Sequence, residues 1–572
     1  MLHSAEAQSR EIDHEKIASL AISTYLNKLP PRGAKPGTKS NGHLEWTVLA
    51  AFILSFPSPT SPSGRDYALI SLATGLKCLP YTSLPPNGDV LHDQHAEVLA
   101  RRGARFWLLN RLHSEVNTGE EGGPKLFEKV EDGERRKLRQ EVQVHLYVST
   151  LPCGDASNKL LEFQRAAQDQ VAGKEGALTL SELLELHTTD SGLCRNAATG
   201  GTGGEGSVVR GRASSAHPSS SSNSVTGSLR TKPGRPDSPP SIAMSCSDKI
   251  ALWNASEIGI QGSLLSALLT PIYIYSITIS DHPTRHIFPS FPLDPSGSET
   301  EEKQRAALRR VLAKDCKRAL NRARTQQEGQ EIEAGWSHQP FADSRESKLE
   351  QAWSAFSSDI TNAQQGPKDK MEAFKANHDP SSCPNSVLHI ASPTFEGGKT
   401  ENLASGTKMG APTKRAKAKE GDLSGPLKSA ARSVVCKLNY YQSVVTLYSS
   451  ISGKDLDQTK GEMLYCDAKA GLLGGGTKAH RKRKDELLGS REDAQKVVER
   501  FLSRARDATA IRGGQRREEE KNSMVNAGKV DEELEEEEAD GQRGAVATFN
   551  GWLRTPASLA RFDLHGRTTS VQ

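Results

Sequence analysis

Two short groups of residues have the types and the placement that a hydrolytic metal site needs. His95 and Glu97 stand two residues apart near the start of an expected helix, and Cys153 follows Pro152 at the end of an expected strand. Imidazole and thiolate are preferred zinc ligands, and a catalytic zinc keeps one position open for water. The pattern predicts a zinc centre with His95 and Cys153 as ligands and Glu97 as a nearby carboxylate that stays off the metal.

Such an arrangement indicates the hydrolytic removal of an amine from a nucleobase. Zinc lowers the pKa of its bound water to about 7, so hydroxide is available at neutral pH to attack the ring carbon that carries the amine. Glu97 is then the general acid and base. It takes the proton of the water and returns it to the ring nitrogen and to the departing ammonia.

Each group also has a simpler interpretation. A His-x-Glu pattern arises often by chance, and the alternative is a histidine and a glutamate on the surface of a helix. Cys153 could be a structural cysteine, because the general zinc pattern is P-C-x-x-C and Ala156 stands where the second cysteine would be. A third ligand must come from elsewhere in the chain, and spacing does not select it among the other cysteines.

The segments that must position these residues alternate between helical and extended patterns. Apolar side chains recur at helical spacing over residues 15–29 and again over 91–112, the stretch that contains His95. Three stretches rich in β-branched and aliphatic residues are predicted strands: 46–56, 66–79 and 142–150. This alternation predicts an α/β fold layered around one sheet, with Cys153 just beyond its third strand.

The composition leaves room for one sizeable core interrupted by polar segments. Only 35% of the 572 residues are hydrophobic, and 49 are glycine and 29 proline. We therefore expect a single domain over residues 10–572. No internal repeat is found in the sequence, so a solenoid is not expected. Four stretches bury too little apolar surface to order themselves and are expected to be disordered insertions: 196–240, 296–385, 395–430 and 505–545. Ordered pieces are expected at 385–392, 433–451 and 551–556.

The charges and the cysteines bear on partners and compartment. A formal net charge of +4 averages an acidic run at 531–540 against basic tracts at 414–419 and 478–484. Basic tracts suit a polyanionic partner, although solvated loops are the alternative. Eight scattered cysteines and an N-terminus without an apolar signal region predict an intracellular protein of the nucleus, the cytoplasm or both. The apolar stretch 258–279 is interrupted by Pro271, so no membrane span is expected.

Three motifs taken together resemble one family. The chain carries, in this order, a D-x-H-A-E segment (93–97), an S-T-x-P-C-G-D-A segment (149–156) and an S-C-S-D-K segment (245–249). These segments resemble the catalytic domain of the adenosine-to-inosine editases, which comprise the tRNA-specific and the double-stranded-RNA adenosine deaminases. The likeness continues through residues 259–266.

The resemblance implies a ligand set and a fold. Cys246 would be the third zinc ligand beside His95 and Cys153, with Glu97 as the proton shuttle. The implied fold is a cytidine-deaminase-like three-layer α/β/α sandwich with a C-terminal helical extension.

Several cationic residues stand in segments that otherwise look buried, among them Lys77, Lys249 and Lys437. An unpaired buried ammonium group is costly, so each must reach solvent, pair with a carboxylate or meet an anionic ligand. The resemblance implies an enclosed inositol hexakisphosphate as a structural cofactor. The positions that match its phosphate-binding residues are Arg101, Arg102, Lys249, Trp253, Ser263, Lys437, Tyr465, Lys469 and Trp552. Lys77 and Asp93 would join a hydrogen-bonded relay between this cofactor and the zinc.

Two positions depart from the family's pattern. Leu252 stands where relatives usually place an arginine against the phosphates, and the missing charge could come from Lys478, Arg481 or Lys482. Leu76 stands where the double-stranded-RNA editors have a threonine that contacts the nucleotide. Contacts to the substrate are therefore not transferred from those enzymes.

The position of the motifs favours the tRNA-specific branch of the family. They begin within the first hundred residues, which the expected first helix and strands fill, so we expect no double-stranded-RNA-binding domain upstream. The segment RTKPGRPDSPP, from Arg230, also resembles that branch. The implied activity converts adenosine to inosine in tRNA, at position 37 next to the anticodon of alanine tRNA, and needs no protein partner for catalysis.

Three rival functions use the same or a related fold. A double-stranded-RNA adenosine deaminase would share all of the motifs. A catalytically inactive RNA-binding homologue would lack Glu97 or a ligand, whereas all of these positions are intact. A free-nucleoside or cytidine deaminase would have a compact chain with P-C-x-x-C, and this sequence has neither.

Overall fold

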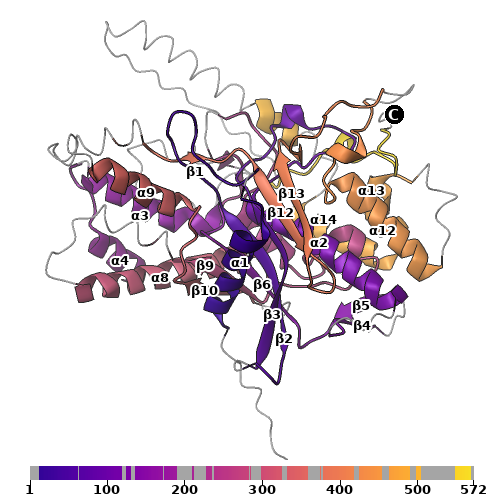
Figure 1. Ribbon diagram of the computed structural model, residues 1–572, viewed down its shortest axis with the longest axis horizontal. Coiled ribbons are helices and arrows are strands. Elements are labelled where there is room, and N and C mark those ends of the chain that lie inside the picture. The colour runs from indigo at the N-terminus through magenta and orange to yellow at the C-terminus, as the bar shows by residue number, and fades with distance from the viewer. Residues whose placement is uncertain are drawn as a thin grey trace, which may run out of the picture.

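The computed structural model describes the core of the chain and many of its connecting segments (Figure 1). The described residues are 12–31, 33–61, 64–118, 124–130, 135–171, 173–189, 209–210, 227–234, 238–281, 284, 298–324, 331–358, 374, 378–417, 424–453, 463–489, 497–503, 548–549 and 551–568. Of the helices in these ranges, none is both long enough and apolar enough to cross a membrane.

A mixed sheet lies at the centre of the described part of the chain. Its eight strands are β2 (Leu49–Pro57), β3 (Arg65–Thr74), β6 (Gln143–Val148), β9 (Ser276–Ser280), β10 (Glu333–Ser337), β12 (Ser386–Ala391), β13 (Gly398–Ala404) and β14 (Thr407–Lys408). The order across the sheet is β10-β9-β6-β2-β3-β12-β13-β14. The pairs β10–β9 and β9–β6 are parallel, and the other neighbours are antiparallel. The strands expected from the first half of the sequence are confirmed as β2, β3 and β6.

Helices cover both faces of this sheet (Figure 1). On one face lies α1 (His14–Lys28), and on the other lies α2 (Ala96–His113). The odd-numbered residues 49–53 of β2 pack in the apolar cluster of α1, and the even-numbered residues 50–54 pack in that of α2. Successive side chains of a strand point to opposite faces, so a continuously buried strand is the pattern of a central strand between two helical layers. The expected three-layer α/β arrangement is confirmed.

Further helices extend the sandwich at its two ends (Figure 1). At one end lie α3 (Asn158–Val171), α4 (Leu180–Thr189), α8 (Ser298–Asn321) and α9 (Arg345–Ser358). Toward the other end lie the C-terminal helices α12 (Lys437–Ser452), α13 (Tyr465–Asp467) and α14 (Gly475–Leu488). Two short helices, α5 (Cys246–Trp253) and α6 (Gly262–Leu265), precede β9. Three small strand pairs complete the regular structure: β1 (Glu45–Trp46) with β11 (Ser381–Ser382), β4 (Phe127–Lys129) with β5 (Arg136–Leu138), and β7 (Val209–Arg210) with β8 (Arg230–Thr231).

Two of the expected insertions contribute strands to the central sheet. Helices α8 and α9 and strand β10 lie within 296–385, and strands β13 and β14 lie within 395–430. The prediction of disorder is therefore wrong over these elements. Helix α8 looks polar in sequence, yet it buries a stripe of small and apolar residues at helical spacing: Leu308, Leu312, Cys316, Ala319 and Leu320. Such a stripe stabilises a helix whatever the charge of its other face.

The other two expected insertions are covered only in part. Within 196–240, residues Arg230–Thr231 form β8, and Lys232 beside them is buried, so the prediction of disorder is wrong there. Most of the remainder of that range lies outside the described residues. The range 505–545 lies wholly outside them.

Gly75 connects β3 to the segment that carries His95. Its φ is +148°, and its carbonyl oxygen accepts a hydrogen bond of 3.1 Å from the backbone N–H of Ala96. A Cβ at this position would lie 2.0 Å from the carbonyl oxygen of Gln94 and 2.4 Å from Oγ of Ser386. Glycine is therefore required here both by the backbone conformation and by the close approach of another segment.

Gly75→Ala is expected to lower the free energy of unfolding by about 2–4 kcal/mol, because a strained φ and an overpacked contact add together. The matched control is Gly42→Ala, because Gly42 has a φ of +82° and an open space where its Cβ would be. It should cost about 1–2 kcal/mol from strain alone. Urea unfolding followed by circular dichroism measures both losses. Equal losses would mean that the contact with Gln94 does not exclude a side chain.

Candidate metal centre and its buried charges

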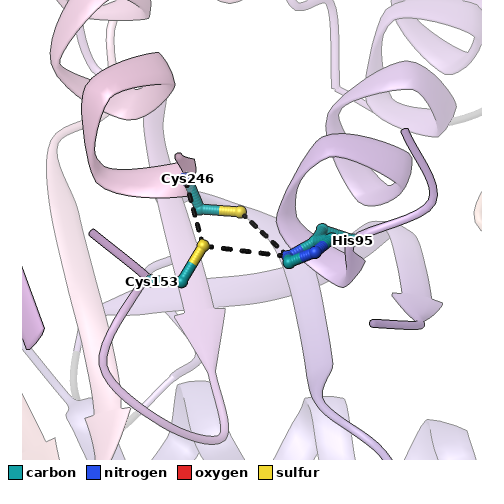
Figure 2. Close-up of side chains that lie close together, drawn as sticks. All are labelled: His95, Cys153 and Cys246. Carbon is teal, nitrogen blue, oxygen red and sulfur yellow. Dashed lines mark hydrogen bonds between the residues drawn. The ribbon is translucent and has the colours of Figure 1, made fainter. Parts of the chain in front are cut away.

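Three side chains from distant segments of the chain converge at one point (Figure 2). His95 is the residue before α2, Cys153 lies in the loop after β6, and Cys246 is the first residue of α5. Nδ1 of His95 lies 3.8 Å from Sγ of Cys153 and 3.6 Å from Sγ of Cys246. The three ligand atoms all lie within 4.8 Å of one another. Tetrahedral zinc with bonds of about 2.0–2.3 Å places its nitrogen and sulfur ligands about 3.5 Å apart, so the spacing fits this metal.

Backbone contacts hold the two cysteine segments against each other. The N–H of Cys246 donates to Sγ of Cys153 at 3.3 Å, and the N–H of Ser247 donates to the carbonyl oxygen of Cys153 at 3.0 Å. Ser245 caps α5, because its Oγ accepts a hydrogen bond from the N–H of Asp248. A backbone N–H that donates to sulfur favours the thiolate form, which is the form that binds metals.

Glu97 lies in the first turn of α2 with a side chain that is only 3% exposed. Burial raises the pKa of its carboxyl group, the charge of Cys153 raises it further, and His95 opposes this shift. A buried carboxyl group with a raised pKa can hold a proton near neutral pH and release it to a stronger base. The residue therefore has the properties of a general acid and base beside the candidate metal centre.

The carboxylate of Asp93 lies between two ammonium groups, one of which contacts a candidate metal ligand. Oδ2 of Asp93 accepts a hydrogen bond of 2.9 Å from Nζ of Lys232 and one of 2.5 Å from Nζ of Lys249. Nζ of Lys232 also donates to Sγ of Cys246 at 3.1 Å. Burial raises the pKa of Asp93, but Lys232 and Lys249 together lower it well below its usual range. A chain of charged groups thus runs from Lys249 through Asp93 and Lys232 to a candidate metal ligand.

Lys232 is the member of this chain that sequence reasoning missed. Lys77 had been expected there with Asp93, but its side chain is exposed and Nζ donates to Oγ of Ser382 at 2.9 Å. Lys232 is 3% exposed, and burial would lower its pKa if the charge of Asp93 did not raise it well above the usual value. The sequence signal was the RTKPGR segment, which lies inside a stretch expected to be disordered.

A second cluster of cations lies between α2 and the C-terminal helices. Arg102 from α2 comes near Lys437 at the start of α12, with Arg101 beside Arg102, and Lys469 lies close to Lys437. Burial lowers the pKa of Lys437 to about 7, and the charges of Lys469 and Arg102 add to this effect. Burial also lowers the pKa of Arg101, with Arg105 as the next cause. An anion placed among cations that repel each other in this way would stabilise them.

Several polar atoms in this cluster lack partners within the described part of the chain. Nε of Arg101 and Nδ1 of His480 are buried there without a hydrogen bond. Gly262 lies close against the guanidinium groups, because a Cβ there would lie 3.2 Å from atoms of both Arg101 and Arg105. Buried donors without partners fit a ligand with many acceptor oxygens, such as a polyphosphate.

The other expected phosphate-binding residues lie at different distances from this cluster. The guanidinium of Arg101 stacks 4.5 Å from the ring of Trp253, and Nζ of Lys469 lies 5.0 Å from the ring of Tyr465. Ser263 follows Gly262 in α6. Trp552 packs edge to face on a phenylalanine in a separate apolar cluster, which also contains Leu252.

Two further residues with nitrogen donors, Arg105 and His480, lie at this cluster beside those that the sequence suggested in place of Leu252. Arg105 lies beside Arg101, with its guanidinium 4.3 Å from the ring of Tyr440. His480 of α14 is buried near Lys484, whose charge is the next cause after burial of its lowered pKa. Lys478 and Lys482 are exposed, and Arg481 approaches Asp485 at 3.6 Å.

Comparison with known proteins gives one family. Residues 71–473 match the family model of the adenosine-deaminase (editase) domain. The tRNA-specific adenosine deaminase 1 of Schizosaccharomyces pombe is 31% identical over 271 residues, 46% of this chain and 58% of the relative. Its counterpart in Drosophila melanogaster is 32% identical over 264 residues, 46% of this chain and 54% of the relative. The double-stranded RNA-specific editase Adar of the same fly is 31% identical over 226 residues, 38% of this chain and 27% of the relative. The matched segment spans little more than half of the first two relatives.

Lys232→Met is expected to weaken zinc binding about 10- to 100-fold, which is the usual effect of removing a residue that supports a metal ligand. The change removes the donor to Cys246 and leaves Asp93 with one ammonium partner. Competition with a chromogenic chelator measures the affinity. Lys77→Met is the matched control and should leave the affinity unchanged, because its ammonium group bonds to Ser382. A loss of zinc affinity in Lys77→Met, with none in Lys232→Met, would place Lys77 in the relay instead of Lys232.

Proposed function

Because the chain belongs to the adenosine-deaminase (editase) family, we propose that it hydrolyses adenosine to inosine in RNA, with tRNA as its substrate. The observation that carries this proposal is the convergence of His95, Cys153 and Cys246 beside the buried carboxyl group of Glu97. One imidazole and two thiolates leave a fourth position for water, as hydrolytic zinc sites do.

The residues of this chain divide the work of the reaction. His95, Cys153 and Cys246 would hold zinc, which when bound supplies the Lewis acidity that makes a water molecule deprotonate near neutral pH. Glu97 accepts the proton of the attacking water, passes one to the ring nitrogen, and protonates the amine as it leaves. Water adds at the ring carbon and ammonia departs, so that inosine and ammonia balance adenosine and water. Burial and the neighbouring Cys153 raise the pKa of the Cys246 thiol, and the ammonium group of Lys232, which donates to its sulfur at 3.1 Å, opposes this shift.

The choice of tRNA rests on the relatives and on one segment of this sequence. Two of the relatives are tRNA-specific adenosine deaminases, and RTKPGRPDSPP resembles that branch. We infer that the target is the adenosine at position 37 of alanine tRNA, flipped out of its stack into the zinc pocket. The likeness to a double-stranded RNA-specific editase makes duplex RNA the alternative substrate.

Glu97→Gln is expected to lower the rate of inosine formation at least 100- to 10,000-fold, because general acid–base catalysis contributes a factor of this size. The measurement is inosine at each adenosine of an alanine tRNA transcribed in vitro. Zinc content should stay at the wild-type value, since Glu97 is not a ligand in this proposal.

The outcomes of this assay separate the alternatives. Inosine at position 37 with wild-type protein, absent with the variant, supports the proposal in full. Inosine only in duplex RNA would keep the chemistry and overturn the substrate. A folded, zinc-loaded wild-type protein that forms no inosine in either RNA would favour the inactive RNA-binding homologue.

We also propose that inositol hexakisphosphate occupies the space among Arg101, Arg102, Lys437 and Lys469. The support is the cluster of repelling cations and the unpaired donors of Arg101 and His480. Phosphate groups would supply both the charge and the acceptors that these side chains need. The ligand would then be part of the core and would stabilise the folded state.

The free energy of unfolding of protein depleted of inositol hexakisphosphate by phytase is expected to rise with pH between about 7 and 10.5. In this range the unfolded chain keeps Lys437 protonated at its ordinary pKa of 10.5, whereas the folded chain has lost the proton above about 7. The unfolded state therefore binds more protons, and stability increases as pH rises. Bound inositol hexakisphosphate should keep Lys437 charged and remove this slope.

Urea unfolding at a series of pH values measures the slope. Lys437→Met should abolish it, whereas Lys482→Met, an exposed lysine of α14, should retain it. A slope that persists in Lys437→Met, or that is unchanged by added inositol hexakisphosphate, would contradict the proposed binding site.

A further inference from the structure

Helix α8 contacts both of the segments that carry the cysteine ligands. It packs against the single turn Asp155–Ser157, just after Cys153, and against α5, which begins with Cys246. The apolar stripe of α8 places it against the core, as described above. Charged side chains at the C-terminal end of α8 then contact these two segments.

Arg318 forms a two-pronged ion pair with a buried carboxylate. Its Nη1 lies 3.0 Å from Oδ2 of Asp155, and its Nη2 lies 3.1 Å from Oδ1 of the same residue. Asp155 is 1% exposed and stands two residues after Cys153. Nε of Arg318 is also engaged, at 2.9 Å from Oδ1 of Asp315. A guanidinium held at both ends in this way fixes the position of the carboxylate.

Arg322, one turn further along, repeats the arrangement on the other segment. Its Nη2 pairs with Oδ1 of Asp248, which is fully buried and stands two residues after Cys246. Its Nη1 lies 3.6 Å from Oδ2 of Asp155, so the guanidinium reaches both carboxylates. It also donates to the carbonyl oxygen of Gly227 at 3.2 Å.

Two buried carboxylates that share one cation repel each other without it, and each is joined to a ligand cysteine by a short backbone segment. The backbone contacts between Cys246, Ser247 and Cys153 leave little room for either segment to adjust on its own. Through these ion pairs the two arginines add a second link between the cysteine segments, beside the backbone contacts that already join them. None of the sequence motifs of the metal centre includes them.

We propose that Arg318 and Arg322 are positioning residues of the metal centre, which clamp the Cys153 and Cys246 segments at the separation that zinc requires. This inference rests on the proposed zinc site. It makes the end of α8, in a stretch expected to be a disordered insertion, a part of the catalytic apparatus.

The same helix offers a matched control. Nη1 of Arg309 lies 3.2 Å from Oδ2 of Asp281, which is also fully buried. Arg309 stands nine residues before Arg318, about 13 Å along the helix, and Asp281 follows β9 rather than a cysteine. Arg309→Met thus breaks an ion pair of the same kind on the same helix without touching the cysteine segments.

The test compares Arg318→Met, Arg322→Met and Arg309→Met in the full chain. Competition with a chromogenic chelator gives the zinc dissociation constant, and the visible spectrum of the cobalt(II)-loaded protein reports ligand geometry. Arg318→Met and Arg322→Met should each weaken zinc binding about 10- to 100-fold and change the cobalt spectrum. Arg309→Met should retain both wild-type values although its unfolding temperature falls by a similar amount.

Two results would overturn the inference: wild-type zinc affinity in both Arg318→Met and Arg322→Met, or an equal loss in Arg309→Met. If a methionine variant does not fold, Arg322→Lys replaces it, because lysine keeps the positive charge but lacks the paired N–H donors of a guanidinium. That variant should still weaken zinc binding, and unchanged affinity would again overturn the inference. A wild-type protein that binds no zinc would instead remove the proposed metal centre itself.

Discussion

The carboxylate of Asp93, held between Lys232 and Lys249, is the interaction on which the rest of the site depends. It lies two residues before His95, and through Lys232 it reaches the sulfur of Cys246. Without the two lysines, burial would favour the neutral acid, and without the carboxylate the ammonium groups would repel each other in a closed space. The fold around it, with α2 on one face of the sheet and α5 beside the loop after β6, brings these distant segments together.

Charged groups lie on two sides of this carboxylate. On one side lie the candidate metal ligands. On the other, α12, α13 and α14 close over the cations of α2, and the pKa of Lys437 is lowered to about 7 by burial and neighbouring charge. A polyphosphate bound among these cations would reduce the repulsion between them. Charged groups would then continue from the C-terminal helices to the candidate metal ligands. At the end of α8, Arg318 and Arg322 pair with Asp155 and Asp248, the buried carboxylates that follow the two cysteines.

The sequence was most informative where periodicity and short motifs coincide. The strand patterns predicted β2, β3 and β6, and helical spacing predicted α2. The helix begins only at Ala96, because residues 92–94 pair in extended form with the segment after β3. Lys232 escaped because it stands before Pro233 in a glycine- and proline-rich stretch, where burial has no periodic signal. Arg318 and Arg322 were not predicted as part of the site, because the many charged residues of α8 obscure its apolar stripe in the sequence. Ion pairs between distant segments depend on the fold, so a single sequence does not reveal them.

The central claim is that His95, Cys153 and Cys246 bind one zinc ion with a fourth position left for water. X-ray absorption at the zinc edge of the purified full chain measures the ligand set directly. The account predicts two sulfur ligands at about 2.3 Å together with nitrogen and oxygen ligands at about 2.0 Å. A shell of nitrogen and oxygen alone, or one of four sulfur ligands, would contradict it.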